Sequence, residues 1–157
     1  MVITAETGRD TPTRAAFGLL LALAAATVLV HALVGGRYGF HRDELATLDD
    51  ARHLAWGYVA YPPVTPFFGW LSLHVFGTSL SGFRFFASLA GGMAIVLTGL
   101  MARELGGGHG AQLFAACAVA PMVIATGTLM QYVSFDYLAW VAVAFFMAVA
   151  SAKAGDA

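Results

Sequence analysis

Charged side chains are scarce in this sequence. Only 11% of its 157 residues are Asp, Glu, Lys or Arg, whereas an average soluble domain has roughly 25%. Hydrophobic residues make up 59% of the chain. So few charges cannot cover a water-facing surface of this size, which excludes an ordinary soluble domain and predicts an integral membrane protein.

Cysteine and basic residues are also few. Cys117 is the single cysteine, so the chain cannot form an internal disulfide. Lys and Arg together number eight, and the formal net charge is -1. Phosphate binding by a nucleic-acid-binding protein requires clustered basic side chains, and no such cluster is present, so a nucleic-acid partner is excluded.

Long apolar runs, by contrast, are present. A helix that crosses a membrane needs about 20 apolar residues, and the segments of this kind are residues 15–35, 80–102, 111–129 and 134–152. The first exceeds the apolar core of a signal peptide, about 7–15 residues, so we expect a retained span that follows a cytoplasmic tail at residues 1–14. The predicted fold class is an all-α integral membrane protein with four transmembrane helices and a large first outer loop at residues 36–79.

The outer loop carries helical signals of its own. From Asp43 onward, Leu45, Leu48 and Arg52 follow a helical spacing, which predicts a helix that rests this stripe on the membrane surface. Residues 64–76 form a second apolar run, too short to cross the membrane but of the size of an interfacial or re-entrant segment. We therefore expect interfacial juxtamembrane helices in the loop.

The basic residues do not orient these spans. Four spans place both chain ends on one side of the membrane and the outer loop on the other, and the cytoplasmic side normally carries the excess of Lys and Arg. Here the two sides have equal numbers. The residues are Arg9, Arg14, Arg103 and Lys153 on the side of the termini, and Arg37, Arg42, Arg52 and Arg84 on the other side.

Asp43 is the candidate catalytic residue of the outer loop. It lies in the first turn of the predicted helix, where the helix dipole favours a carboxylate, and such a carboxylate can act as general base toward an acceptor hydroxyl. Asp50 follows seven residues later and is roughly aligned with it. The alternative interpretation is a water-exposed helix face on which Asp43 is an N-terminal cap.

A divalent metal site is a second interpretation of the loop. It would use His41, Asp43, Asp49 and His53, of which the last two share a helix face at a spacing of four residues. The loop has no compact motif with two histidines, so we assign no metal ligand and leave a divalent metal open as a cofactor.

Asp136 is the third candidate. It opens the last apolar run, on the same side of the membrane as the outer loop. A carboxylate near the end of a span requires water or a partner, which makes it a functional candidate. Arg84, at the start of the second span, is the predicted partner for Asp136 or for an anionic phosphate.

Three segments together resemble a known family. They are FHRDELATLDDARHLAWGYVAYPPVTPFFGWLSLHVFG, SGFRFFASLAGG and QYVSFDYLAW. They are similar to the start of bacterial membrane glycosyltransferases of the dolichyl-phosphate-mannose protein mannosyltransferase and aminoarabinose transferase type, which have the GT-C fold. The resemblance extends from Arg37 to about Ala150.

The resemblance implies a reaction and a set of site residues. The donor would be a sugar on a polyprenyl phosphate, held in membrane lipid, and the acceptor would be met on the extracytoplasmic face of the inner membrane. The outer loop would then be extracytoplasmic and both termini cytoplasmic. Asp43 would act as base with Glu44 and Asp136 as further catalytic groups, and Arg84, His41 and Tyr61 would bind substrate.

The sequence departs from this family in two respects. Relatives usually carry a polar or charged pair before the double proline, where this chain has Ala60 and Tyr61. They also contain many more transmembrane helices, so we expect either the N-terminal portion of a larger enzyme or a short relative that associates with itself or with a second membrane subunit. The alternative function is a non-catalytic small membrane protein that binds a lipid phosphate or stabilises a partner complex.

Overall fold

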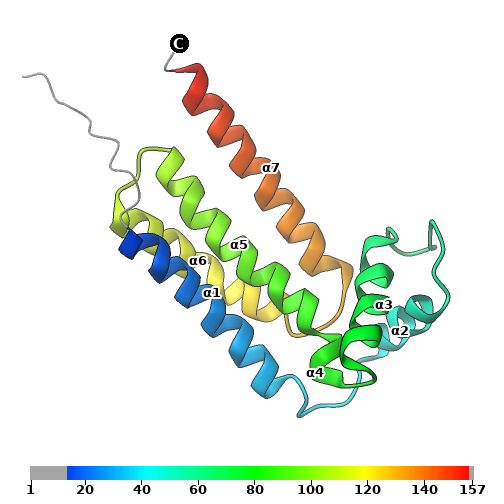
Figure 1. Cartoon of the computed structure of the whole chain (residues 1–157). Helices are drawn as coiled ribbons and strands as arrows, with labels where there is room; N and C mark the ends of the chain where they lie inside the picture. The colour runs from blue at the N-terminus through cyan, green and yellow to red at the C-terminus, as the bar shows by residue number, and fades with distance from the viewer. Residues whose placement is uncertain (1–13, 156–157) are drawn as a thin grey trace, which may run out of the picture.

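The structure, a computed structural model, describes residues 14–155, and within them it contains helices and no strand. The helices are α1 (Arg14–Val34), α2 (Arg42–Arg52), α3 (Val64–Phe76), α4 (Leu80–Phe83), α5 (Phe85–Glu104), α6 (His109–Thr126) and α7 (Tyr132–Ala154) (Figure 1). Four of them, α1, α5, α6 and α7, are long and apolar enough to cross a membrane. The predicted fold class is confirmed.

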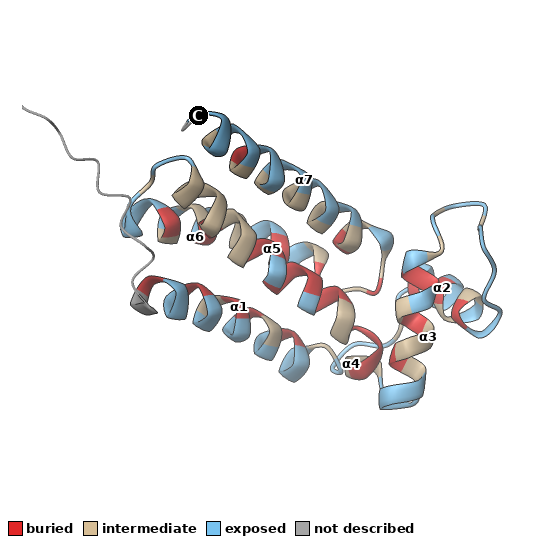
Figure 2. Cartoon of the chain, turned by 45° about the horizontal axis from the view of Figure 1, so that its top comes forward, coloured by how far each residue is buried: buried red, intermediate tan, exposed pale blue. Residues whose placement is uncertain are grey.

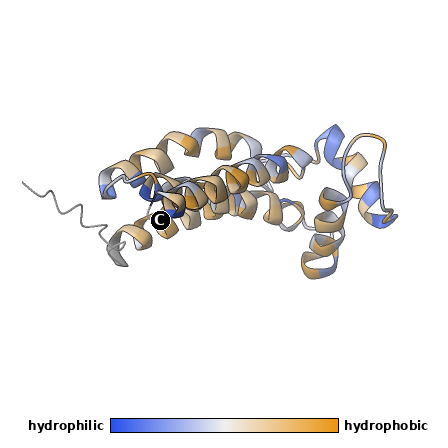
Figure 3. Ribbon diagram, turned by 90° about the horizontal axis from the view of Figure 1, so that it is seen from above, coloured by the Kyte–Doolittle hydropathy of each residue, from blue (hydrophilic) through white to orange (hydrophobic). Residues whose placement is uncertain are grey.

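The long helices run alternately up and down. The start of α1 and the end of α7 lie at one end of the bundle, and α2, α3 and α4 lie at the other (Figure 1). Hydrophilic residues gather on α2 and at the helix ends, while the long helices are apolar along their length (Figure 3). The predicted N-terminal tail falls almost wholly on residues 1–13, outside the described residues.

Helix α5 is the centre of the bundle and packs against α1, α6 and α7. Glycines allow this close packing: a Cβ at Gly99 would lie 2.5 Å from a methyl carbon of Leu20, and a Cβ at Gly91 would lie 2.5 Å from a methyl carbon of Val123. Buried positions follow α5, whereas α7 is exposed over most of its surface (Figure 2). Exposed apolar side chains on α7 include Trp140, Phe146 and Met147.

The predicted bounds of the spans differ from the structure at several points. The segment from residue 80 is helical, but it is divided at Arg84 into the short α4 and the long α5. Helix α6 ends at Thr126 and not at 129. Helix α7 begins at Tyr132, so Asp136 lies in its second turn and not in the first. These shifts arise because polar and glycine-containing turns, not apolar length alone, decide where a helix stops.

Helix α2 was predicted to rest Leu45, Leu48 and Arg52 on the membrane surface, and this placement stays a prediction, because Leu45 and Arg52 are exposed side chains that are free to face lipid. The buried side chains of α2 are Glu44, Thr47 and Ala51, while Leu45 is 52% exposed. The reason is α3, which packs on α2: a Cβ at Gly69 would lie 3.0 Å from the Cβ of Ala51. The contact between the two helices therefore decides which face of α2 is inside.

His31 joins α1 to the end of α6. Its Nδ1 lies 2.8 Å from the carbonyl oxygen of Thr27 and its Nε2 lies 3.0 Å from that of Ile124. The last carbonyls of a helix lack intrahelical partners, and here each has found one. Val123 accepts from the Gly127 amide, Ile124 faces His31, Ala125 accepts from the Thr128 hydroxyl, and Thr126 accepts from the Ser134 hydroxyl.

Replacing His31 with alanine should therefore destabilise the bundle. Only 7% of His31 is exposed, and removal of its ring leaves the part-buried Ile124 carbonyl without this contact, at a cost of about 1 kcal/mol. We expect a lower midpoint of thermal unfolding in detergent. His74→Ala is the matched control, because His74 bonds only to the carbonyl of Trp70 on its own helix and is exposed; equal effects of the two substitutions would contradict the cross-helix role of His31.

Candidate functional site

The start of α2 is fixed by a capping box. His41 precedes the helix with an extended backbone, and its Nδ1 accepts a hydrogen bond from the Asp43 amide at 3.3 Å. The Glu44 carboxylate in turn accepts from the His41 amide at 2.9 Å. This reciprocal pair satisfies two amides that the helix cannot satisfy itself, and it places Asp43 and Glu44 in the first turn, near the predicted helix start.

Glu44 and Arg84 form a buried ion pair at this end of the bundle. The Glu44 side chain is fully buried and that of Arg84 is 7% exposed. Arg84 donates from Nε to Oε1 at 2.7 Å and from Nη2 to Oε2 at 2.5 Å. This two-point contact is the geometry in which a guanidinium binds a carboxylate most strongly.

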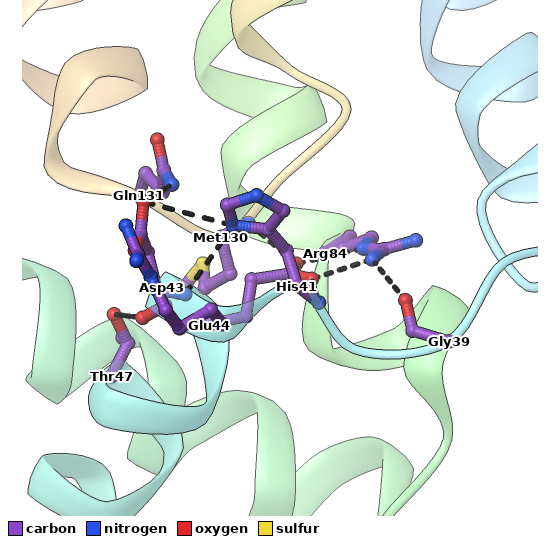
Figure 4. Close-up of polar contacts among 9 residues, drawn as sticks. Gly39, His41, Asp43, Glu44, Thr47, Arg84, Met130 and Gln131 are labelled. Atoms are coloured by element: carbon purple, nitrogen blue, oxygen red, sulfur yellow. Dashed lines mark hydrogen bonds and ion pairs between the residues drawn. The ribbon is translucent and has the colours of Figure 1, made fainter.

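The ion pair connects four parts of the chain. Arg84, at the junction of α4 and α5, also donates to the carbonyls of Gly35, after α1, and Gly39, before α2. Glu44 on α2 accepts from the amide of Met130, in the connection between α6 and α7, at 2.9 Å. The predicted pairing of Arg84 with Asp136 is therefore wrong, because the guanidinium is already occupied by Glu44 and two carbonyls; Figure 4 shows Arg84 beside Glu44 and the Gly39 carbonyl.

The surroundings of Glu44 keep it charged. Burial alone raises the pKa of a carboxyl group, but hydrogen bonds from Arg84, Met130 and His41 and the positive charge of Arg84 outweigh it, so the pKa of Glu44 lies below its usual value. All of these groups donate to its two oxygens. Glu44 is thus a buried anion with its acceptors in use.

Asp43, by contrast, is presented to the outside. Its side chain is 49% exposed. The side-chain amide of Gln131 donates to Oδ2 at 3.0 Å, and Arg42 donates from Nε to Oδ1 at 3.3 Å. Gln131 directly precedes α7, so the segment that supplies Met130 to Glu44 also orients Asp43 (Figure 4). The Asp43 carboxylate is therefore half-exposed, and one hydrogen bond to each of its oxygens fixes its orientation.

Tyr61 lies on the same side of α2, further along the helix. Its hydroxyl donates to Oδ2 of Asp50 at 2.5 Å, and its ring stacks on that of Tyr132 at the start of α7, with 6.1 Å between the ring centres. Burial, followed by the nearby Asp50 carboxylate, raises the pKa of Tyr61. Tyr61 is therefore a neutral hydroxyl donor that bridges α2 and α7.

Asp136 stands apart from these residues. It is exposed, and no hydrogen bond or ion pair joins its side chain to another residue between 14 and 155. It follows Tyr132 by four residues and so shares a helix face with it, and its neighbour Phe135 stacks on Phe68 of α3 with 5.0 Å between ring centres. The structure thus brings His41, Asp43, Glu44 and Arg84 together and leaves Asp136 one helical turn beyond the Tyr61–Tyr132 stack.

The candidate metal ligands of the outer loop do not lie together in a cluster of three or more within the described residues. Asp49 and His53 do share a face, with 3.6 Å between Oδ1 and Nδ1, but both side chains are more than three-quarters exposed. Among residues 14–155, no group of three or more His, Cys, Asp or Glu side chains is arranged to hold a metal ion. A divalent metal stays a prediction.

Comparison with known proteins identifies the family. Neither the curated proteins nor the solved structures give a match. The family model described as dolichyl-phosphate-mannose-protein mannosyltransferase matches residues 60–155, which is more than half of the chain and includes Tyr61, Arg84 and Asp136. The match begins after α2, so it does not extend to Asp43 and Glu44. The chain belongs to the dolichyl-phosphate-mannose-protein mannosyltransferase family.

Proposed function

We propose that this membrane glycosyltransferase takes its sugar from a polyprenyl-phosphate donor, with Asp43 as the general base. One observation carries the proposal: the half-exposed Asp43 carboxylate is oriented by Gln131 and lies directly beside the fully buried Glu44–Arg84 pair. A base needs one accessible oxygen in a fixed position. Glu44 cannot take that role in this arrangement, because its oxygens already accept four hydrogen bonds.

The reaction is a displacement at the anomeric carbon. An acceptor hydroxyl attacks that carbon, the bond from the carbon to the phosphate oxygen breaks, and the polyprenyl phosphate leaves with the bonding electrons. Asp43 removes the proton from the attacking hydroxyl. Glu44 and Arg84 act as positioning residues: they fix the first turn of α2 to Met130 and therefore to Gln131.

The phosphate of the donor needs accessible positive charge. Arg84 is buried and occupied, so the exposed groups beside Asp43 suit this task better: Arg42, whose side chain is 91% exposed, and His41, whose side chain is 50% exposed. Arg42 already lies 3.3 Å from Asp43. We propose that both bind the donor phosphate and that Asp136, on the face of Tyr132, borders the same reaction site.

An apolar groove suits the prenyl chain of the donor. It has a volume of about 530 Å³ and is lined by residues 54–56 and by Pro63, Val64, Phe67 and Phe68 of the α3 region. No charged side chain lines it. Phe68, one of its lining residues, stacks on Phe135 of α7, which directly precedes Asp136. Our proposed topology places this end of the bundle on the extracytoplasmic face of the inner membrane and both termini in the cytoplasm.

A donor-competition assay tests the function. Membranes from source cells that carry the gene, and matched membranes from cells that lack it, are supplied with radiolabelled sugar as polyprenyl phosphate or as sugar nucleotide. We expect gene-dependent release of unlabelled polyprenyl phosphate and transfer of label from the first donor only. Transfer from the nucleotide in the absence of polyprenyl phosphate would overturn the proposed donor. Donor binding without transfer would favour the non-catalytic alternative.

A further inference from the structure

A hollow on α2, separate from Asp43 and from the apolar groove, is lined by two tyrosines, one carboxylate and small or apolar residues. Its volume is about 640 Å³, and it lies between α2, at Ala46 and Asp50, and residues 57–61 of the following segment. Tyr58 and Tyr61 line it, with 6.1 Å between their ring centres. The small side chain of Ala46 lies between Asp43 and Asp50 on this face and leaves room above the helix.

The walls of this hollow are fixed by hydrogen bonds. The Tyr58 hydroxyl accepts from the Ala55 amide at 2.8 Å and lies 3.1 Å and 3.2 Å from the carbonyls of Asp50 and His53, which share its single proton. It thereby ties the segment to the end of α2. Tyr61 is held by Asp50 on one side and by the Tyr132 ring on the other. A preformed wall lowers the ordering cost of binding.

The chemistry of the lining indicates the kind of ligand. One oxygen of Asp50 accepts from Tyr61, and the other is available to accept from a hydroxyl. The Tyr61 hydroxyl, which gives its proton to Asp50, can itself accept. Tyrosine rings offer flat apolar faces for C–H groups. A phosphate is disfavoured in this hollow because its one charged lining residue, Asp50, is an acid and no basic side chain lines it.

We propose that this hollow binds a neutral pyranose ring, with Asp50 and Tyr61 as the residues that recognise its hydroxyls. The proposal rests on the function proposed above, because it places a sugar next to the reaction site. Asp43 and Asp50 are seven residues apart, which is about 10 Å along a helix. A pyranose held at Asp50 therefore lies about two helical turns from Asp43. The sugar belongs either to the donor or to the acceptor.

Saturation-transfer NMR on the whole chain tests this site without requiring turnover. The chain is placed in lipid nanodiscs, because detergents with sugar headgroups would compete. The probes are methyl α-D-mannopyranoside and methyl β-D-glucopyranoside, and the negatively charged methyl glucuronide is the probe that Asp50 should reject. We expect saturable binding of at least one neutral pyranoside and none of the glucuronide.

Two variants and one matched control locate the binding. Asp50→Ala and Tyr61→Phe should each weaken pyranoside binding by roughly tenfold, since each removes a hydrogen-bonding group to the ligand. Tyr61→Phe keeps the ring and its stack on Tyr132, so it reports on the hydroxyl even if Asp50→Ala proves unstable. Asp49→Asn, next to Asp50 but on an exposed face with His53, should bind normally. Absence of binding to the unmodified chain, or equal binding by all variants, would overturn the proposal.

Kinetics then decide which substrate supplies the sugar. A rise in KM for the polyprenyl-phosphate sugar in Tyr61→Phe assigns the hollow to the donor, and a rise in KM for the acceptor assigns it to the acceptor. An Asp43→Asn chain should still bind the pyranoside. If Asp43→Asn instead transfers sugar at the normal rate, the proposed base is wrong while the pyranose site stands.

Discussion

Asp43→Asn should lower sugar transfer by about 10²- to 10⁴-fold, the range by which a positioned general base accelerates a reaction. Asparagine has nearly the same shape and retains an oxygen that accepts from Gln131, whose amide now lies 3.0 Å from Asp43. It cannot take the proton of an acceptor hydroxyl. The loss should therefore appear in kcat, with little change in the amount of folded protein in the membrane.

The control for this substitution lies on the same helix. Asp49→Asn changes an equal charge, but Asp49 is 77% exposed and pairs only with His53 at the far end of α2. Initial rates of transfer are compared at saturating donor, after the two variants are matched for membrane content. A loss of less than tenfold in Asp43→Asn, or an equal loss in both variants, would show that Asp43 is not the base.

The long helices could be predicted from the sequence, because a run of about 20 apolar residues has few structural alternatives. The start of α2 was predicted to within one residue from Asp43, but its cap is His41 and not Asp43, which lies inside the first turn. What could not be predicted was the face of α2 that is buried. Glu44 and Thr47 interrupt its apolar pattern, and their burial depends on Arg84 and on α3.

In the candidate site, too, the features set by neighbouring residues could be predicted, and the contacts between distant segments could not. Asp43 was found because its position in the first helical turn is a local property. Gln131 was missed, although it contacts Asp43 from 88 residues away. The only local signal was a polar residue directly before an apolar span. The Glu44–Arg84 pair, 40 residues apart, was missed because no local signal distinguishes Glu44 from the other acidic residues at the same membrane boundary, which are Asp43, Asp49, Asp50 and Asp136.

Arg84→Ala should cause the largest loss of stability among the substitutions considered. Removing one partner of a buried ion pair leaves the other charge uncompensated and costs about 3–5 kcal/mol. In addition, the carbonyls of Gly35 and Gly39 lose their donor. The matched control is Arg103→Ala: Arg103 pairs with Glu104, but these side chains are 30% and 22% exposed, so its removal should cost about 1 kcal/mol or less. Unfolding in detergent, followed by circular dichroism, measures both.

Acid should also weaken the Glu44–Arg84 pair. The direction of this pH dependence follows from the pKa of Glu44. Its pKa is lower in the folded protein than its ordinary value of 4.5, so the folded state prefers the charged form and binds fewer protons than the unfolded state. The stability that Glu44 contributes is then complete above pH 4.5 and is lost as the pH falls through the lower, folded value. Glu44→Gln removes this titration but leaves Arg84 without its anion. The variant should therefore be less stable than the unmodified protein at neutral pH, and the difference should shrink in acid. A difference that stays constant as the pH falls well below 4.5 would contradict a charged Glu44, because protonation of that carboxylate must remove its contribution.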